Sequence, residues 1–343
     1  MRDSFKSGFI LLTGMLASAM AFAEPDWSKI PGKDIPMFFP GQSGYEWIMS
    51  RPDHTGSLKL KEKKQNCYDC HEYDADVIGN DVVEGKKVGK SRTVIDTAVP
   101  EGTRGNFPLK VKAAHDETKI YLRFEWESPA AATGAKSDPD NEVKLSLMFG
   151  GDSTEGVNMS GCWMSCHMDL RTMPESSAKA KKHARAKALG WNDGATKYLA
   201  VSRSSISEEK KPRGGWDKLR GDKEIKTALE AGNFLDLIQY RSGAGGKSSD
   251  GYVLESRHMN GGKSLVGATG AREGNKWIVT FERLLAGGAP GDHTIKPGQA
   301  LTFGVSIHEN YRNARFHHVS LGYTLGIDNG ETFIKSAVLP TGK

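Results

Sequence analysis

The chain has 343 residues, with 47 Lys and Arg against 42 Asp and Glu, a formal net charge of +5 and a hydrophobic content of 37%. This composition excludes a polytopic membrane protein and a mostly disordered chain, and so mild a charge gives no support for a dedicated nucleic-acid binder. The four cysteines are too few for a disulfide framework in a chain of this length, so their placement is the informative feature.

The first 23 residues have the three-part pattern of a secretory signal peptide. Arg2 and Lys6 precede an apolar run over residues 8–20, and an A-x-A cleavage motif ends at Ala23. The run of about 13 residues is shorter than the roughly 20 that a transmembrane helix needs. We therefore expect cleavage after Ala23, export to a periplasm or beyond, and no membrane span in the mature chain.

The remaining chain divides at about residue 93 into two predicted domains. Residues 24–93 have few apolar positions and many prolines, and only 45–50 and 58–65 favour short helices. We expect this part to be a small coil and α-helical module that cannot build a core by itself.

Residues 94–343 have a different pattern, in which apolar and polar residues alternate in several short segments. The alternating segments are 120–126, 143–147, 277–281, 301–307 and 319–325. Period-two alternation is typical of half-buried strands, and several such strands joined by glycine-rich turns predict an antiparallel β-sandwich. We expect two helical inserts, over 175–189 and 223–240. The fold class is therefore mainly β.

All four cysteines fall in two close pairs, and a histidine directly follows each pair. The two motifs are Cys67-Tyr-Asp-Cys70-His71 and Cys162-Trp-Met-Ser-Cys166-His167. C-x-x-C-H is the attachment signature of c-type haem, and C-x-x-x-C-H widens it by one residue. Two cysteines on one helical turn can reach two vinyl groups of one porphyrin, while the adjacent imidazole binds the iron. We expect two covalently bound haem c groups, with His71 and His167 as proximal ligands.

Two other uses of the cysteines stay open. Zinc needs four nitrogen or sulfur ligands, which four Cys or two Cys with two His could supply. Alternatively, each pair could form a local redox disulfide.

Each iron has a second axial position that a further His or Met could close. His54 precedes Cys67 within the same core-poor module, and we expect it to be the distal ligand of the first haem. For the second haem, the residues leave several histidines open: His258, His308, His317 and His318. Since His317 and His318 are adjacent at the start of a predicted strand, they should point to opposite faces, one toward a haem and one toward solvent.

Several segments of the second part resemble the haem-binding domain family related to the gamma subunit of ethylbenzene dehydrogenase. They are 161–169 with Met173-Pro174, 197–203, 307–311 and 315–320. The segment from Tyr45 through His54 to His71 is similar to the small cytochrome c module sometimes placed ahead of that domain.

The resemblance implies a β-sandwich that holds one haem at its edge and an electron-transfer role. In the molybdenum-enzyme subunits of the family that haem is b-type and is held by Met and Lys. Here a covalent motif is present, so His167 would replace one family ligand. The resemblance puts the family lysine near 315–320, which makes His317 the first choice for the distal ligand, ahead of His318, His308 and His258.

These features predict an exported dihaem c-type cytochrome that transfers electrons between redox protein partners. We expect an electron carrier rather than an enzyme, and we assign no catalytic residues. The protein could form an oligomer or be a subunit of a respiratory complex. One alternative is a haem enzyme with one open iron that acts on a small nitrogen, sulfur or peroxide species. Another is a binding module, because sandwiches of this kind also bind sugars.

Overall fold

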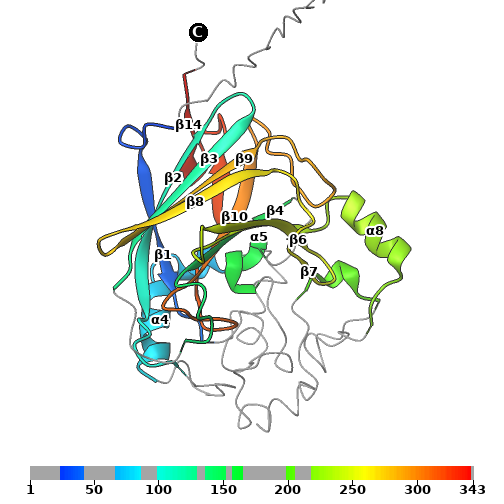
Figure 1. Cartoon of the computed structure of the whole chain (residues 1–343). Coiled ribbons are helices and arrows are strands. Elements are labelled where there is room, and N and C mark those ends of the chain that lie inside the picture. Colours follow the sequence, from blue (N-terminus) through cyan, green and yellow to red (C-terminus); the bar gives the residue numbers. More distant parts are fainter. Residues whose placement is uncertain are drawn as a thin grey trace, which may run out of the picture.

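The computed structural model describes residues 24–41, 66–85, 99–129, 136–151, 157–164, 198–204 and 218–340. Within these ranges the chain is mainly β and most neighbouring strands run antiparallel, which confirms the predicted fold class (Figure 1). The strands are β1 Gly32–Phe38, β2 Asn106–His115, β3 Lys119–Glu127, β4 Lys144–Gly150, β5 Leu235–Arg241, β6 Lys247–Val253, β7 Arg257–His258, β8 Leu265–Glu273, β9 Lys276–Leu284, β10 Ala300–His308, β11 His318–Val319, β12 Tyr323–Gly326, β13 Ile334–Lys335 and β14 Ala337–Val338.

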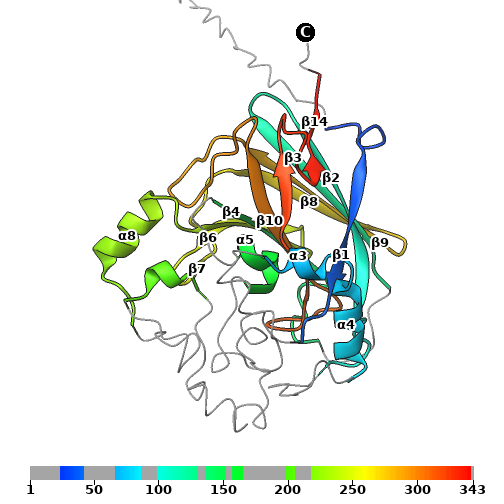
Figure 2. The same ribbon diagram turned by 180° about the vertical axis from the view of Figure 1, so that it is seen from behind.

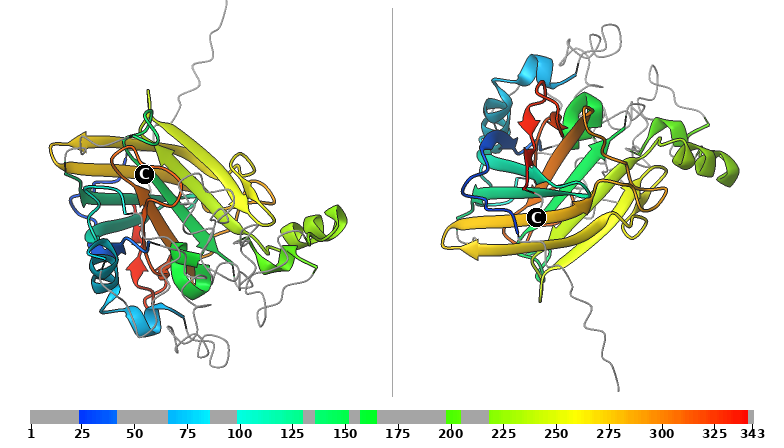
Figure 3. Two further views of the ribbon diagram at one scale, coloured as in Figure 1. Left: turned by 90° about the horizontal axis from the view of Figure 1, so that it is seen from below. Right: turned by 90° about the horizontal axis from the view of Figure 1, so that it is seen from above.

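These strands form one continuous sheet that curls back on itself. Its order is β7-β6-β5-β4-β10-β11-β1-β2-β3-β9-β8, and β12, β13 and β14 attach to β10, β12 and β2. The views along the vertical axis show the curl (Figure 3). Near the two ends of the sheet, the Tyr240 hydroxyl on β5 donates a hydrogen bond of 3.1 Å to the Gly270 carbonyl on β8. The curl encloses an apolar core between the two halves of the sheet.

In the predicted strands, the apolar residues of the alternating pattern are the buried ones. On β3, the side chains of Ile120, Leu122, Phe124 and Trp126 are all buried. The segments 143–147, 277–281 and 301–307 likewise lie on β4, β9 and β10. The segment 319–325 is divided between β11 and β12, because Ser320 pairs back to β10 through two hydrogen bonds of 2.9 Å with Val305.

Eight strands lie outside the segments that the sequence indicated: β1, β2, β5, β6, β7, β8, β13 and β14. β1 and β5 show why the sequence pattern missed them. β1 lies in the middle of the sheet between β11 and β2, although Pro36 obscures its alternation. The segment 223–240, expected to be helical, holds helix α8 only over Asp222–Glu230, and its second half is strand β5. The helix ends at Glu230, and Gly232, two residues later, has a φ of +78° that suits the position after a helix C-terminus. The chain therefore leaves the helix before strand β5 begins at Leu235.

The other short helices are α3 Tyr68–His71, α4 Ala75–Val83, α5 Val157–Ser160 and the 3₁₀ turns η1 Gly161–Met164 and η3 Ala200–Ser202. The view from behind shows α3 and α4 beside β1, with α5 close by at the same end of the sheet (Figure 2). The predicted signal peptide and the predicted helices at 45–50, 58–65 and 175–189 lie outside the described residues. Within the described ranges, no helix is both long and apolar enough to cross a membrane.

Candidate functional site

The first cysteine motif forms one turn of helix. Cys67 caps α3, and its carbonyl accepts hydrogen bonds from the amides of Cys70 (3.3 Å) and His71 (2.9 Å). Because the three residues stand at helix positions i, i+3 and i+4, their side chains share one face of the turn. The Nδ1 atom of His71 is 2.8 Å from the Asp74 carboxylate, which favours a proton on Nδ1 and a lone pair on Nε2. This is the arrangement that orients a metal-binding imidazole.

The helix that follows this motif is anchored tightly to the sheet. A methyl group at Gly79 on α4 would lie 2.1 Å from the Gly105 carbonyl oxygen and 3.1 Å from the Phe38 Cβ. Only glycine permits so close an approach between the helix backbone and the segment that leads into β2. The Asn106 amide also donates a hydrogen bond of 2.9 Å to Asn80 on α4. The motif is therefore held against β1 and β2.

The described part of the second motif is the 3₁₀ turn η1, which lies on β10. Gly161 adopts φ +59°, a conformation that favours glycine, and Cys162 and Trp163 are buried. A methyl group at Gly304 on β10 would lie 2.3 Å from the Cys162 amide nitrogen. The turn and the strand are therefore in direct backbone contact.

Aromatic side chains pack each motif against the sheet. The ring of Phe38, at the end of β1, makes an edge contact with Trp163 at a centroid distance of 5.1 Å, while its Cβ faces Gly79 on α4. Tyr68, inside the first motif, makes an edge contact with Tyr323 on β12 at 5.4 Å. Phe38 therefore contacts both the second motif and the helix that follows the first.

The four candidate histidines differ in which ring nitrogen contacts the protein. In His317, Nδ1 is 2.9 Å from the Ala314 carbonyl oxygen, whereas in His308 it is Nε2 that is 2.9 Å from the same oxygen. The two rings pack at a centroid distance of 4.7 Å. Among the four candidates, His317 therefore has the hydrogen-bond pattern of His71, with Nδ1 on a protein oxygen.

The other two candidates use Nε2 for protein contacts. His318 places Nε2 2.8 Å from the Arg104 carbonyl, and its ring lies between Phe39 and Phe107. Burial lowers the pKa of His318 to about 4, so its ring is neutral at pH 7. The expectation that one of the adjacent pair faces solvent is wrong, since His317 and His318 are only 4% and 5% exposed.

The fourth candidate, His258, lies on the short strand β7. Its Nε2 is 2.5 Å from the Glu255 carboxylate and 3.0 Å from the Ser256 hydroxyl. Its ring also stacks on Tyr252 at a centroid distance of 4.5 Å. The contacts of His258 therefore hold its imidazole beside Glu255 and Tyr252.

The thiol environment bears on the zinc and disulfide alternatives. Burial, with smaller contributions from Cys70 and Asp69, raises the pKa of Cys67 to about 12. A thiol that stays protonated is a poor starting point for a zinc thiolate. Cys67 and Cys70 are not joined by a disulfide. Among the described residues, these cysteines do not belong to any group of three close His, Cys, Asp or Glu side chains.

Three of the predicted haem-binding residues, His54, Cys166 and His167, lie outside the described residues. The structure also reveals one cluster that the sequence gave no reason to expect. Asp236, Asp250 and Asp292 each place one carboxylate oxygen within 4.8 Å of the other two. Their positions in the sequence follow no metal-binding spacing, so no local signal could have identified them.

The chain was compared with known proteins. The family model described as ethylbenzene dehydrogenase matches residues 24–274. Cytochrome c-552 of Stutzerimonas stutzeri is 38% identical over 314 residues, which cover 90% of this chain and 90% of that protein. Cytochrome c-551 of Rhodocyclus tenuis is 29% identical over 314 residues, or 91% of this chain and 99% of that protein.

Two solved structures of a family 9 carbohydrate binding module from Caldicellulosiruptor kristjanssonii were also matched, each at 9% identity. The complex with glucose has a TM-score of 0.27 and covers 67% of this chain and 72% of that one. The complex with cellotriose has a TM-score of 0.28 and covers 72% and 84%.

Proposed function

Because the chain belongs to the ethylbenzene dehydrogenase family, we propose that it is an exported dihaem c-type cytochrome that transfers electrons between redox protein partners. Two relatives that match it along nearly its whole length are named cytochromes c, which supports a haem c protein with an electron-transfer role. Export rests on the signal-peptide pattern of residues 1–23, with cleavage after Ala23.

The observation that carries this proposal is the turn of helix at Cys67–His71. Its two cysteines would hold a haem through thioether bonds, and the lone pair on His71 Nε2 would bind the iron, with Asp74 orienting the imidazole. A bound haem supplies an iron that gains and loses one electron. The second motif would hold another haem through Cys162, Cys166 and His167.

The distal ligands in this proposal are His54 for the first haem and His317 for the second. His317 is preferred because the family resemblance points to 315–320 and because its Nδ1, 2.9 Å from the Ala314 carbonyl oxygen, gives it the same hydrogen-bond pattern as His71. His318, His308 and His258 rank behind it, since in each of them Nε2 lies on a protein oxygen.

Phe38 on β1 contacts Trp163 of the second motif and faces α4, the helix that follows the first motif, which supports a carrier with both haem groups on one sheet. The two motifs would then hold two haem groups between which an electron passes within the chain. One partner could then deliver an electron at the first haem while another accepts it at the second.

Intact mass of the purified protein, together with a haem-stained denaturing gel, tests the haem count. We expect the mass of a chain that starts at Glu24 plus two haems. The double variant Cys162→Ser with Cys166→Ser should lose one haem and keep the other. A wild-type mass with one haem would refute the dihaem proposal, and a chain that retains residues 1–23 would refute signal cleavage.

Absorption and electron paramagnetic resonance spectra test the distal ligands. The wild type should be low-spin at both irons and should not change on adding carbon monoxide to the reduced protein. His317→Gln should make one haem high-spin and open to carbon monoxide, whereas the neighbouring control His318→Gln should stay low-spin. A wild-type protein with one five-coordinate haem would favour the enzymatic alternative over a carrier.

A further inference from the structure

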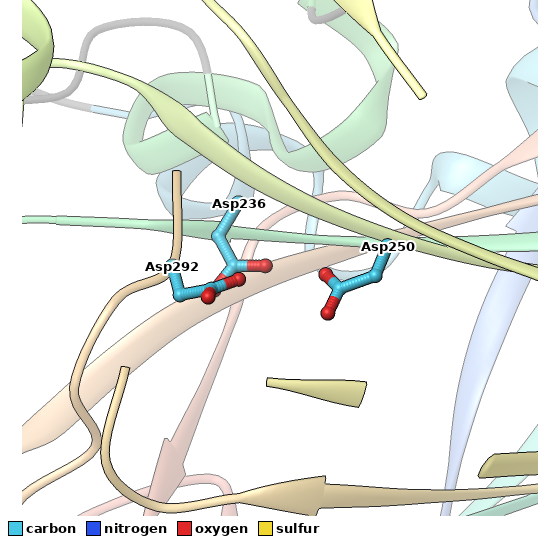
Figure 4. A group of neighbouring side chains, drawn as sticks. All are labelled: Asp236, Asp250 and Asp292. Carbon is cyan, nitrogen blue, oxygen red and sulfur yellow. The ribbon is translucent and has the colours of Figure 1, made fainter. Parts of the chain in front are cut away.

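Asp236, Asp250 and Asp292 form a cluster in which Asp236 and Asp292 are buried and Asp250 is half-buried. Asp236 comes from β5, Asp250 from β6 and Asp292 from the loop between β9 and β10. Their carboxylates converge from the three segments (Figure 4). The cluster therefore joins strands near one end of the sheet to a loop that is remote in sequence.

The cluster holds more negative charge than its surroundings neutralise. The nearby cation is Arg283, which is fully buried, pairs with Oδ2 of Asp236 and donates a bond of 2.6 Å to the His293 carbonyl. Burial raises the pKa of Asp236, and burial together with the other two carboxylates raises the pKa of Asp250 to about 6. With three carboxylates and one guanidinium, two negative charges are left that protons or a cation must balance.

Two carboxylate oxygens in the cluster are buried and have no hydrogen-bond partner among the described residues. Asp236 is 0% exposed, and its Oδ1 makes no such bond, although its Oδ2 is bound by Arg283 and by the His293 amide. Asp250 as a residue is half-buried; its Oδ1 also lacks a partner, and its Oδ2 accepts a bond of 2.7 Å from the Leu265 amide. Leaving a buried acceptor without a partner is costly, so such atoms indicate a missing ligand.

The backbone keeps the space between the carboxylates open. A methyl group at Gly262 would lie 2.2 Å from Asp250 Oδ1 and 2.6 Å from Asp292 Oδ1, so any side chain there would block both oxygens. Asp292 is held in place by the Ser264 hydroxyl at 3.1 Å and the Lys263 amide at 2.9 Å. Hydrogen bonds from neighbouring residues thus hold the carboxylates of Asp250 and Asp292 in place within the cluster.

We propose that Asp236, Asp250 and Asp292 bind one Ca²⁺ ion, which links β5 and β6 to the loop before β10. Calcium takes hard oxygen ligands at about 2.3–2.6 Å, so two oxygens on one ion are separated by at most about 5 Å. The three oxygens, within 4.8 Å of one another, meet this limit without rearrangement. The ion neutralises the two remaining charges and occupies the coordination space of both Oδ1 atoms. None of the three aspartates belongs to either cysteine motif.

The test uses the full-length holoprotein, freed of metal by a chelating resin. Calorimetric titration with CaCl₂ should show one site, and saturating Ca²⁺ should raise the midpoint of thermal unfolding by about 5 °C over the protein in EDTA. In Asp250→Asn, affinity should fall at least tenfold. Because this substitution removes a repelling charge but keeps an acceptor for the Leu265 amide, the variant in EDTA should be at least as stable as the wild type.

The control is Asp34→Asn, which removes one exposed carboxylate far from the cluster and should leave the response to Ca²⁺ unchanged. Equal unfolding midpoints in CaCl₂ and EDTA, with no heat of binding up to millimolar Ca²⁺, would overturn the proposal. So would a response of the same size in Asp250→Asn. We expect MgCl₂ to give a smaller shift, and an equal shift with Mg²⁺ would overturn the assignment to calcium.

Discussion

The contact between η1 and β10 makes a prediction about Gly304→Ala. The substitution leaves every cysteine and histidine in place and adds one methyl group beneath the second motif. That methyl would lie 2.3 Å from the Cys162 amide nitrogen, 2.6 Å from the Gly161 carbonyl carbon and 2.8 Å from the Gly161 Cα. All three are backbone atoms, so no rotation of a side chain can relieve the overlap.

The magnitude follows from how much the backbone must move. Ordinary contacts between heavy atoms are about 3.5 Å or more, so η1 must shift by roughly 1 Å. β10 cannot move instead, because it is paired with β4 along its length and with β11 and β12. Overpacking of this kind costs about 1–3 kcal/mol, which corresponds to a fall in the unfolding midpoint of roughly 5 °C in a domain of this size.

Thermal unfolding followed by circular dichroism measures this loss, and intact mass measures haem content. Gly304→Ala should be destabilised and should carry less covalently attached haem at the second motif than at the first. Gly267→Ala is the matched control, since Gly267 is also on a strand but a methyl group there meets nothing within 4 Å. If both variants unfold at the wild-type temperature with full haem content, the tight packing of η1 on β10 is refuted.

Three other substitutions test different parts of the packing. Phe38→Ala removes a fully buried ring that contacts Trp163 and should cost about 3–5 kcal/mol in urea unfolding; a loss below about 1 kcal/mol would contradict its role. Arg283→Met leaves the Asp236 carboxylate buried without its guanidinium and should cost about 3–5 kcal/mol in EDTA, whereas wild-type stability would argue against the ion pair. Burial lowers the pKa of His115, so the unfolded chain binds the proton more readily and stability should fall as the pH drops below about 6.5. His115→Gln should reduce that dependence in urea unfolding at pH 7.5 and 5.5; an unchanged pH slope would contradict it.

The strands that sequence analysis identified correctly are those in which apolar and polar residues alternate regularly. β3 and β10 carry their large apolar side chains on one face and polar or small residues on the other, so the period-two alternation is visible in the sequence. β5 is buried on both faces at Leu235–Ile238, which removes the alternation, and its leucines happen to continue the spacing of α8. β1 contains Pro36 yet lies in the middle of the sheet, since its pairing with β2 and β11 is decided by remote segments.

By itself, the sequence determined the candidate chemistry of the cysteine motifs, because Cys67, Cys70 and His71 occupy a single turn whose geometry depends only on neighbouring residues. The tertiary structure decided everything that requires distant strands to meet. It placed Phe38 against both Trp163 and α4, gave His317 and His318 different hydrogen-bond patterns, and brought the carboxylates of three aspartates within 4.8 Å of one another. Such contacts depend on strand pairing and on the curl of the sheet, and neither leaves a local signal in the order of the residues.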